Sequence, residues 1–114
     1  MATRYYISLP EPARARGADP ALAFHAHGAE EFAAQLQDAL RTSSLFERWR
    51  ARQEDPEGVD VSYGAIDPDT HVHGQQDDLH VNLIVTSSIP GNVLKHRLRL
   101  LAGSGWELRD VTAA

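Results

Sequence analysis

The chain has 114 residues, of which 42% are hydrophobic and 24% charged, a composition that is typical of one globular domain and argues against wholesale disorder. It contains no cysteine, which excludes disulfide bonds and thiolate zinc sites. Its net charge of −5 disfavours general binding to nucleic acid or to an anionic membrane.

The first half of the chain predicts two strands and two helices. Residues 4–9 alternate between apolar and polar side chains, as a half-buried strand does. Residues 22–27 alternate in the same way, although the preceding Asp19-Pro20 is also a good start for a long helix. From residue 29 to residue 41 the apolar positions recur at helical spacing, and a second, shorter helix begins near Ser44.

The second half of the chain predicts three more strands and one helix. Residues 59–63 alternate as a strand, whereas residues 67–78 are rich in Asp, Gly and Gln and predict a loop that carries His71 and His73. Residues 79–86 form the clearest strand. A helix follows from Ser88 and Pro90 to Gly103, and residues 106–111 complete the pattern as a last strand.

With residues 4–9 set aside, the order is strand, helix, strand, strand, helix, strand. This order predicts a single α+β domain of ferredoxin-like (βαββαβ) arrangement over residues 1–114. We expect an antiparallel sheet of four to five strands with two main helices on one face, residues 4–9 being an extra N-terminal strand. Many unrelated functions share this arrangement, so no activity follows from it.

The six histidines are the first candidate for chemistry. If residues 22–27 were a central strand, His25 and His27 would project from the face opposite the helices, beside His80. Three imidazoles there would suit a divalent metal such as zinc, so the competing hypothesis is a small metal-binding protein or metal-dependent enzyme that uses this face. Solvated imidazoles are also tolerated on an outward sheet face, and this second interpretation is favoured because no metal-binding motif accompanies the histidines.

A basic stripe on the last helix is the second candidate. Lys95, His96 and Arg99 share one side of that helix, which would suit phosphate, RNA or an acidic partner. An ordinary solvated helix face explains the same pattern, and it is favoured because no aromatic residue lies among the charges to stack on bases.

No catalytic motif is found, so the leading hypothesis is a non-enzymatic binding or regulatory module without a cofactor. An open sheet face that carries Tyr6, Asn82 and Ile84 would mix apolar and polar groups, as the contact of a homodimer or of another protein partner does. We expect a cytoplasmic protein, because the longest apolar run is too short for a membrane span and the N-terminus lacks a signal-peptide core.

Overall fold

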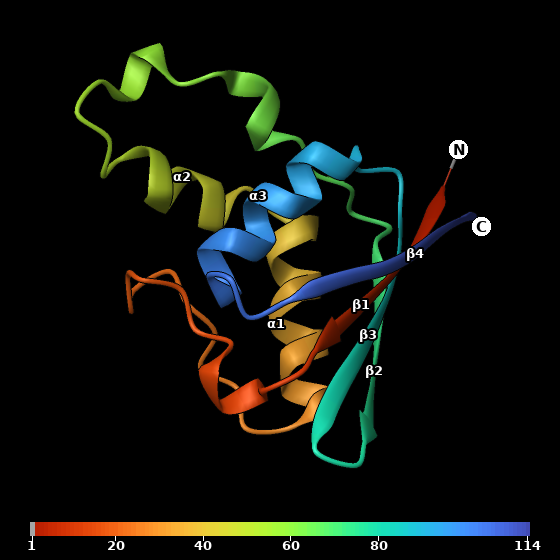
Figure 1. Ribbon diagram of the computed structural model, residues 1–114. Coiled ribbons are helices and arrows are strands. Elements are labelled where there is room, and N and C mark those ends of the chain that lie inside the picture. Colours follow the sequence, from red (N-terminus) through yellow and green to blue (C-terminus); the bar gives the residue numbers. More distant parts are fainter. Residues whose placement is uncertain (1) are drawn as a thin grey trace.

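The computed structural model describes residues 2–114 and consists of a sheet layer and a helix layer (Figure 1). The sheet is antiparallel with the strand order β2-β3-β1-β4. Its strands are β1 (Thr3–Leu9), β2 (His71–Asp77), β3 (His80–Ser87) and β4 (Glu107–Ala113). The helices are α1 (Ala29–Arg41), α2 (Ser44–Arg50) and α3 (Gly91–Ala102). The predicted α+β class is therefore confirmed.

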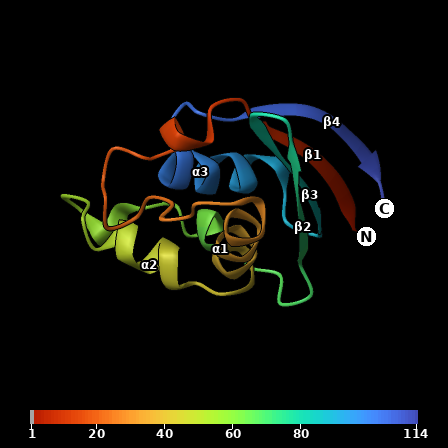
Figure 2. The same ribbon diagram turned by 90° about the horizontal axis from the view of Figure 1, so that it is seen from below.

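All three helices lie on one side of the sheet (Figure 2). Helix α1 packs on β2 and β3 and against α3, whereas α2 contacts α1 and lies farther from the strands. A long connection leads from α2 to β2 and contains two short 3₁₀ turns, η2 (Pro56–Gly58) and η3 (Val61–Gly64). The opposite side of the sheet carries no helix, so its outward side chains remain uncovered.

The predicted strand at residues 22–27 is wrong, and with it the idea that residues 4–9 are an extra strand. The alternation itself is real, since Phe24 and Ala26 are buried while His25 and His27 are exposed. The backbone nevertheless pairs with no strand. Phe24 N–H donates to the carbonyl of Leu101 at 2.9 Å, and His25 N–H donates to the Gln35 side chain at 3.0 Å. Strand β1 itself takes the central position, between β3 and β4.

Two further predictions are corrected between α2 and β3. Residues 59–63 do not form a strand, because this stretch leads into η3. Within residues 67–78, predicted to be a loop, residues 71–77 form the edge strand β2. Only Val72 of this strand is buried in the core, and Gly74 lies so close to α1 that an added Cβ would be 2.2 Å from the Ala29 carbonyl oxygen. An edge strand with one buried side chain lacks the alternation that predicts a strand.

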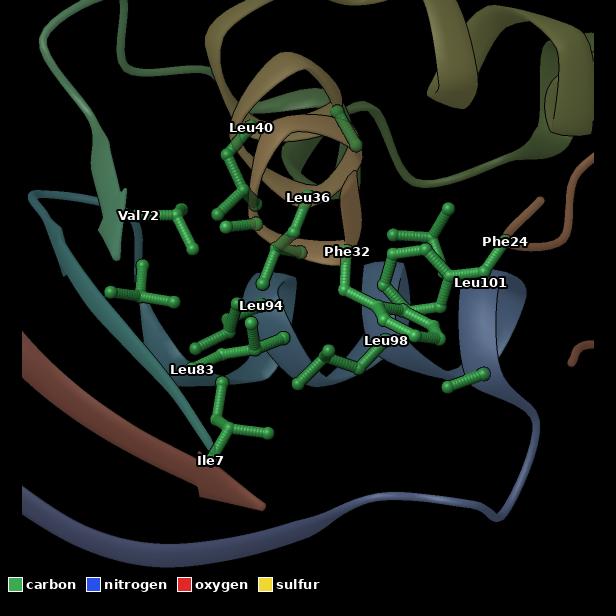
Figure 3. Packing of buried hydrophobic residues seen from close by; sticks show 14 of the residues in the cluster. Ile7, Phe24, Phe32, Leu36, Leu40, Val72, Leu83, Leu94, Leu98 and Leu101 are labelled. Carbon is green, nitrogen blue, oxygen red and sulfur yellow. The ribbon is translucent and has the colours of Figure 1, made fainter. Parts of the chain in front are cut away.

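The hydrophobic core lies between the sheet and helices α1 and α3 (Figure 3). Ile7 and Leu83 point from the sheet toward Leu36 and Leu98 on the helices. Phe24 closes the end of this core by packing edge-on against Phe32, with ring centroids 4.9 Å apart. Burying each of these side chains contributes about 1.5–3 kcal/mol, which is why the alternating residues 22–26 pack inward without a strand partner.

Candidate functional site

The uncovered side of the sheet is the first candidate site, and we call it the open face. Its residues are those that alternate with the core-facing positions of the four strands, as the strand registers show. They are Arg4, Tyr6, Ser8, His71, His73, Gln75, Asp77, His80, Asn82, Ile84, Thr86, Glu107, Asp110 and Thr112, joined by Arg109, which lies at the register shift in β4 and lines a hollow on this face. Most are polar, so the open face is hydrated in an isolated copy of the chain.

A row of four side chains crosses the middle of the open face. The registers pair His73 with Ile84, Ile84 with Tyr6, and Tyr6 with Asp110. Ile84 and Tyr6 are half-buried, whereas His73 and Asp110 at the two ends of the row are exposed. The row therefore has an apolar centre, a histidine at one end and a carboxylate at the other.

A polar hollow of about 550 Å³ lies at one end of the open face. His80 Nε2 is 3.5 Å from a carboxylate oxygen of Asp77, and Arg109 donates to Glu107 at 2.7 Å across the hollow's rim. Its lining consists of Ser8, Pro10, Asp77, His80, Asn82, Glu107 and Arg109. Within residues 2–114, the Ser8 hydroxyl has no hydrogen bond to a histidine, so no Ser–His pair for nucleophilic catalysis is assembled here.

The structure does not bring His25, His27 and His80 together. His25 lines a hollow beside α1 and α2, where its ring nitrogen is 2.8 Å from the Pro20 carbonyl oxygen. His27 lines another hollow beside the β2–β3 turn, and His80 lies on the open face. Across the described residues 2–114, no three His, Asp or Glu side chains are grouped closely enough to hold one metal ion.

The five residues predicted to contact a partner divide between two surfaces. Tyr6, Asn82 and Ile84 lie on the open face, as expected. Lys95 and Arg99 lie on the exposed side of α3, in the helix layer. They belong to a separate region of the molecule.

His71 and His73 were assigned to a loop by their polar surroundings and are the residues that sequence analysis missed on the open face. Both project from β2 on the outward side, on either side of the buried Val72. The alternation is limited to the three residues His71, Val72 and His73, which is too short to predict a strand.

The second candidate region lies where α2, α3 and η3 meet, and we call it the helical cluster: Trp49, Tyr63, His96 and Arg97. The His96 ring is edge-on to Trp49 with centroids 4.4 Å apart, and it lies 4.9 Å from the Tyr63 ring. Its Nδ1 is buried and, within residues 2–114, has no hydrogen-bond partner. Burial is the main cause that lowers the pKa of His96, and the positive charges of Arg99 and Arg97 lower it further.

Arg97 is the fully buried member of the helical cluster. Its guanidinium donates to the carbonyl oxygens of Ala39 at 2.7 Å, Tyr63 at 2.9 Å and Ala65 at 2.7 Å. Ala39 is in the last turn of α1, where carbonyl groups lack helical partners and the helix dipole is negative. Three carbonyl oxygens, one of them at the negative end of α1, thus stabilise the buried guanidinium in place of a carboxylate. Through these bonds Arg97, which is on α3, connects η3 with α1.

No protein-family model, curated protein or solved structure matches the chain. Within residues 2–114, no helix combines the length and the apolar character that crossing a bilayer requires.

Proposed function

We propose that the protein is a non-enzymatic binding module that forms a homodimer by pairing two open faces. The observation that carries this proposal is the central row of the open face, whose ends differ in chemical character. A surface with this asymmetry is complementary to a second copy of itself turned by 180°.

The geometry of such a dimer follows from the strand order. A two-fold axis that runs parallel to the strands, midway between β1 and β3, places β2 of each copy over β4 of the other. The central row of one copy then faces the central row of the other copy in the opposite order. His73 lies opposite Asp110 of the partner subunit, and Ile84 lies opposite Tyr6 of the partner subunit.

Charge supports the same arrangement beyond the central row. Strand β2 contributes His71 and His73 toward one end of the open face, where β4 contributes Asp110. At the other end β2 contributes Asp77, whereas β4 contributes both Glu107 and Arg109, which form an ion pair with each other. Exchanging β2 with β4 across the contact therefore brings the histidines of β2 to the Asp110 side of β4 at the first end, which favours this register over others.

The size of the open face is consistent with a small interface. Four strands about 4.8 Å apart and seven residues long make a footprint of roughly 19 by 23 Å. With its polar character, this footprint fits the lower end of specific protein contacts, where dimers are reversible.

We also infer that the sheet is a ferredoxin-like one in which β1, α1, β2, β3, α3 and β4 are the six basic elements. The strand order and antiparallel pairing fit that arrangement. Helix α2 and the connection through η2 and η3 are then an insertion between α1 and β2.

The test of the dimer is its oligomeric state at increasing protein concentration, measured by light scattering after size exclusion and by sedimentation equilibrium. We expect a dimer in the micromolar range. Ile84→Lys places a charge at the centre of the contact and should give a monomer. Ile66→Lys is the matched control, since Ile66 is 44% exposed and lies outside the open face. A wild-type monomer at 100 micromolar, roughly the limit of a weak specific contact, would overturn the proposal.

A further inference from the structure

A small hollow in the helix layer joins an aromatic ring to two arginines. It lies between the end of α2, the end of α3 and the segment that precedes α1, and its volume is about 260 Å³. Trp49, Arg52 and Arg99 line it, together with Asp19, Gln53 and Leu100. No local sequence pattern predicts this grouping, because Trp49 and Arg99 are far apart in the chain.

The two arginines differ in how they are held. Arg52 Nε donates to the Asp19 carboxylate, which fixes the guanidinium at the rim of the hollow. Arg99 is exposed and, within residues 2–114, takes part in no ion pair or side-chain hydrogen bond. Lys95 lies one helical turn before Arg99 on the same exposed side. At the mouth of the hollow, the positive charge of Arg99 is therefore not paired with any carboxylate among residues 2–114.

The Trp49 ring is held in place by two neighbouring rings. The His96 ring packs edge-on against it, and the Phe46 ring lies 5.8 Å away at a tilt. Gln53 donates to the Trp49 carbonyl oxygen at 3.0 Å, which orders the chain just after α2. Because the indole is half-buried and supported by other rings, it presents a fixed apolar surface to the hollow, next to Leu100.

We propose that this hollow binds a nucleoside monophosphate, free or as one unit of an RNA chain, with the base against Trp49 and the phosphate on Arg99 and Arg52. Aromatic side chains bind bases through stacking, and guanidinium groups bind phosphate oxygens in pairs of hydrogen bonds. The Asp19 carboxylate, already neutralised by Arg52, is placed to accept a hydrogen bond from a ribose hydroxyl or a base amine. A bare phosphate would not use Trp49, and an apolar ligand would not use Arg99.

The test is a fluorescence titration of the Trp106→Phe variant, in which Trp49 is the single tryptophan. We expect adenosine monophosphate to quench this fluorescence to saturation, adenosine to bind more weakly, and inorganic phosphate to compete without quenching. Arg99→Gln should raise the dissociation constant for adenosine monophosphate about tenfold. Arg14→Gln is the matched control, because Arg14 is an exposed arginine paired with Glu11 at 3.2 Å, and it should leave binding unchanged.

Two results would overturn the proposal: no saturable quenching by millimolar adenosine monophosphate, or equal affinities for the wild type, Arg99→Gln and Arg14→Gln. A short single-stranded RNA identifies the source of the nucleotide. Tighter binding of the RNA, with a steep salt dependence that Arg99→Gln reduces, assigns the site to RNA. Equal affinity for RNA and mononucleotide assigns it to the free nucleotide. None of these readouts depends on the dimer of open faces.

Discussion

The open face and the helical cluster are built in opposite ways. The open face is regular, since all its residues except Arg109 are placed by strand alternation and register, and its polar residues other than Ser8 remain in contact with water. The helical cluster joins α2, η3 and α3, and Arg97 inside it reaches three carbonyls from two other parts of the chain. This difference predicts that substitutions in the helical cluster lower the free energy of unfolding more than substitutions on the open face.

The largest expected effect is the loss of Arg97. Arg97→Ala leaves the buried carbonyl of Ala39 and the part-buried carbonyls of Tyr63 and Ala65 without donors, and we expect a cost of about 3 kcal/mol or more in the free energy of unfolding. The measurement is urea unfolding followed by circular dichroism. Arg4→Ala is the control for the open face and should cost less than about 1 kcal/mol. Equal decreases in the free energy of unfolding for the two variants would contradict the predicted difference between the two regions.

An intermediate effect is expected where β2 approaches α1. Gly74→Ala puts a methyl group against the Ala29 carbonyl oxygen and should destabilise the fold by about 1–3 kcal/mol, because strand and helix must separate. Gly28→Ser is the contrasting variant. Its Cβ meets nothing within 4 Å, and serine is a good residue at the start of α1, so stability should be unchanged or slightly raised. Thermal unfolding of both variants tests the prediction, and an unaffected melting temperature for Gly74→Ala would contradict it.

The smallest expected effect is a pH dependence that comes from His96. The pKa of His96 is lowered in the folded state by burial, Arg99 and Arg97, so folding favours the neutral ring. The resulting stability is fully present above the unfolded-state pKa of 6.5 and is lost as pH falls below that value. Because the ring is half-exposed, solvent screening limits the effect to a fraction of a kcal/mol.

The variant His96→Phe isolates this contribution. It keeps the ring contacts with Trp49 and Tyr63 and removes the titratable group and its unpartnered Nδ1. Urea unfolding of wild type and variant is measured between pH 7.5 and pH 5.5. The free energy of unfolding of the wild type should fall more steeply with decreasing pH than that of the variant. If the free energies of unfolding of the two proteins fall in parallel with pH, the predicted contribution of His96 is contradicted.

Much of the fold was predictable because several elements carry strong local patterns. The alternation of β3 and the apolar stripes of α1 and α3 were read correctly from the sequence. Strand β2 was not, since one buried valine and a glycine make no periodic signal. Residues 22–27 were misread because burial of alternate side chains against a helix end resembles burial in a sheet.

The candidate sites were predictable only where they follow from periodicity. The positions of Tyr6, Asn82 and Ile84 on the open face came from alternation alone. The helical cluster and the hollow beside Trp49 depend on contacts between residues roughly thirty-five to eighty positions apart. No local pattern encodes such contacts, which is why the basic stripe was expected to lack an aromatic neighbour.

The most direct test of the central claim is a charge exchange across the proposed dimer contact, followed by sedimentation equilibrium. His73→Asp places two carboxylates opposite each other at both ends of the contact and should weaken the dimer at least tenfold. Asp110→His places two histidines there and should also weaken it. The double variant, His73→Asp with Asp110→His, restores unlike pairs and should recover dimerisation. A double variant that dimerises no better than the worse single variant would contradict the two-fold pairing of open faces.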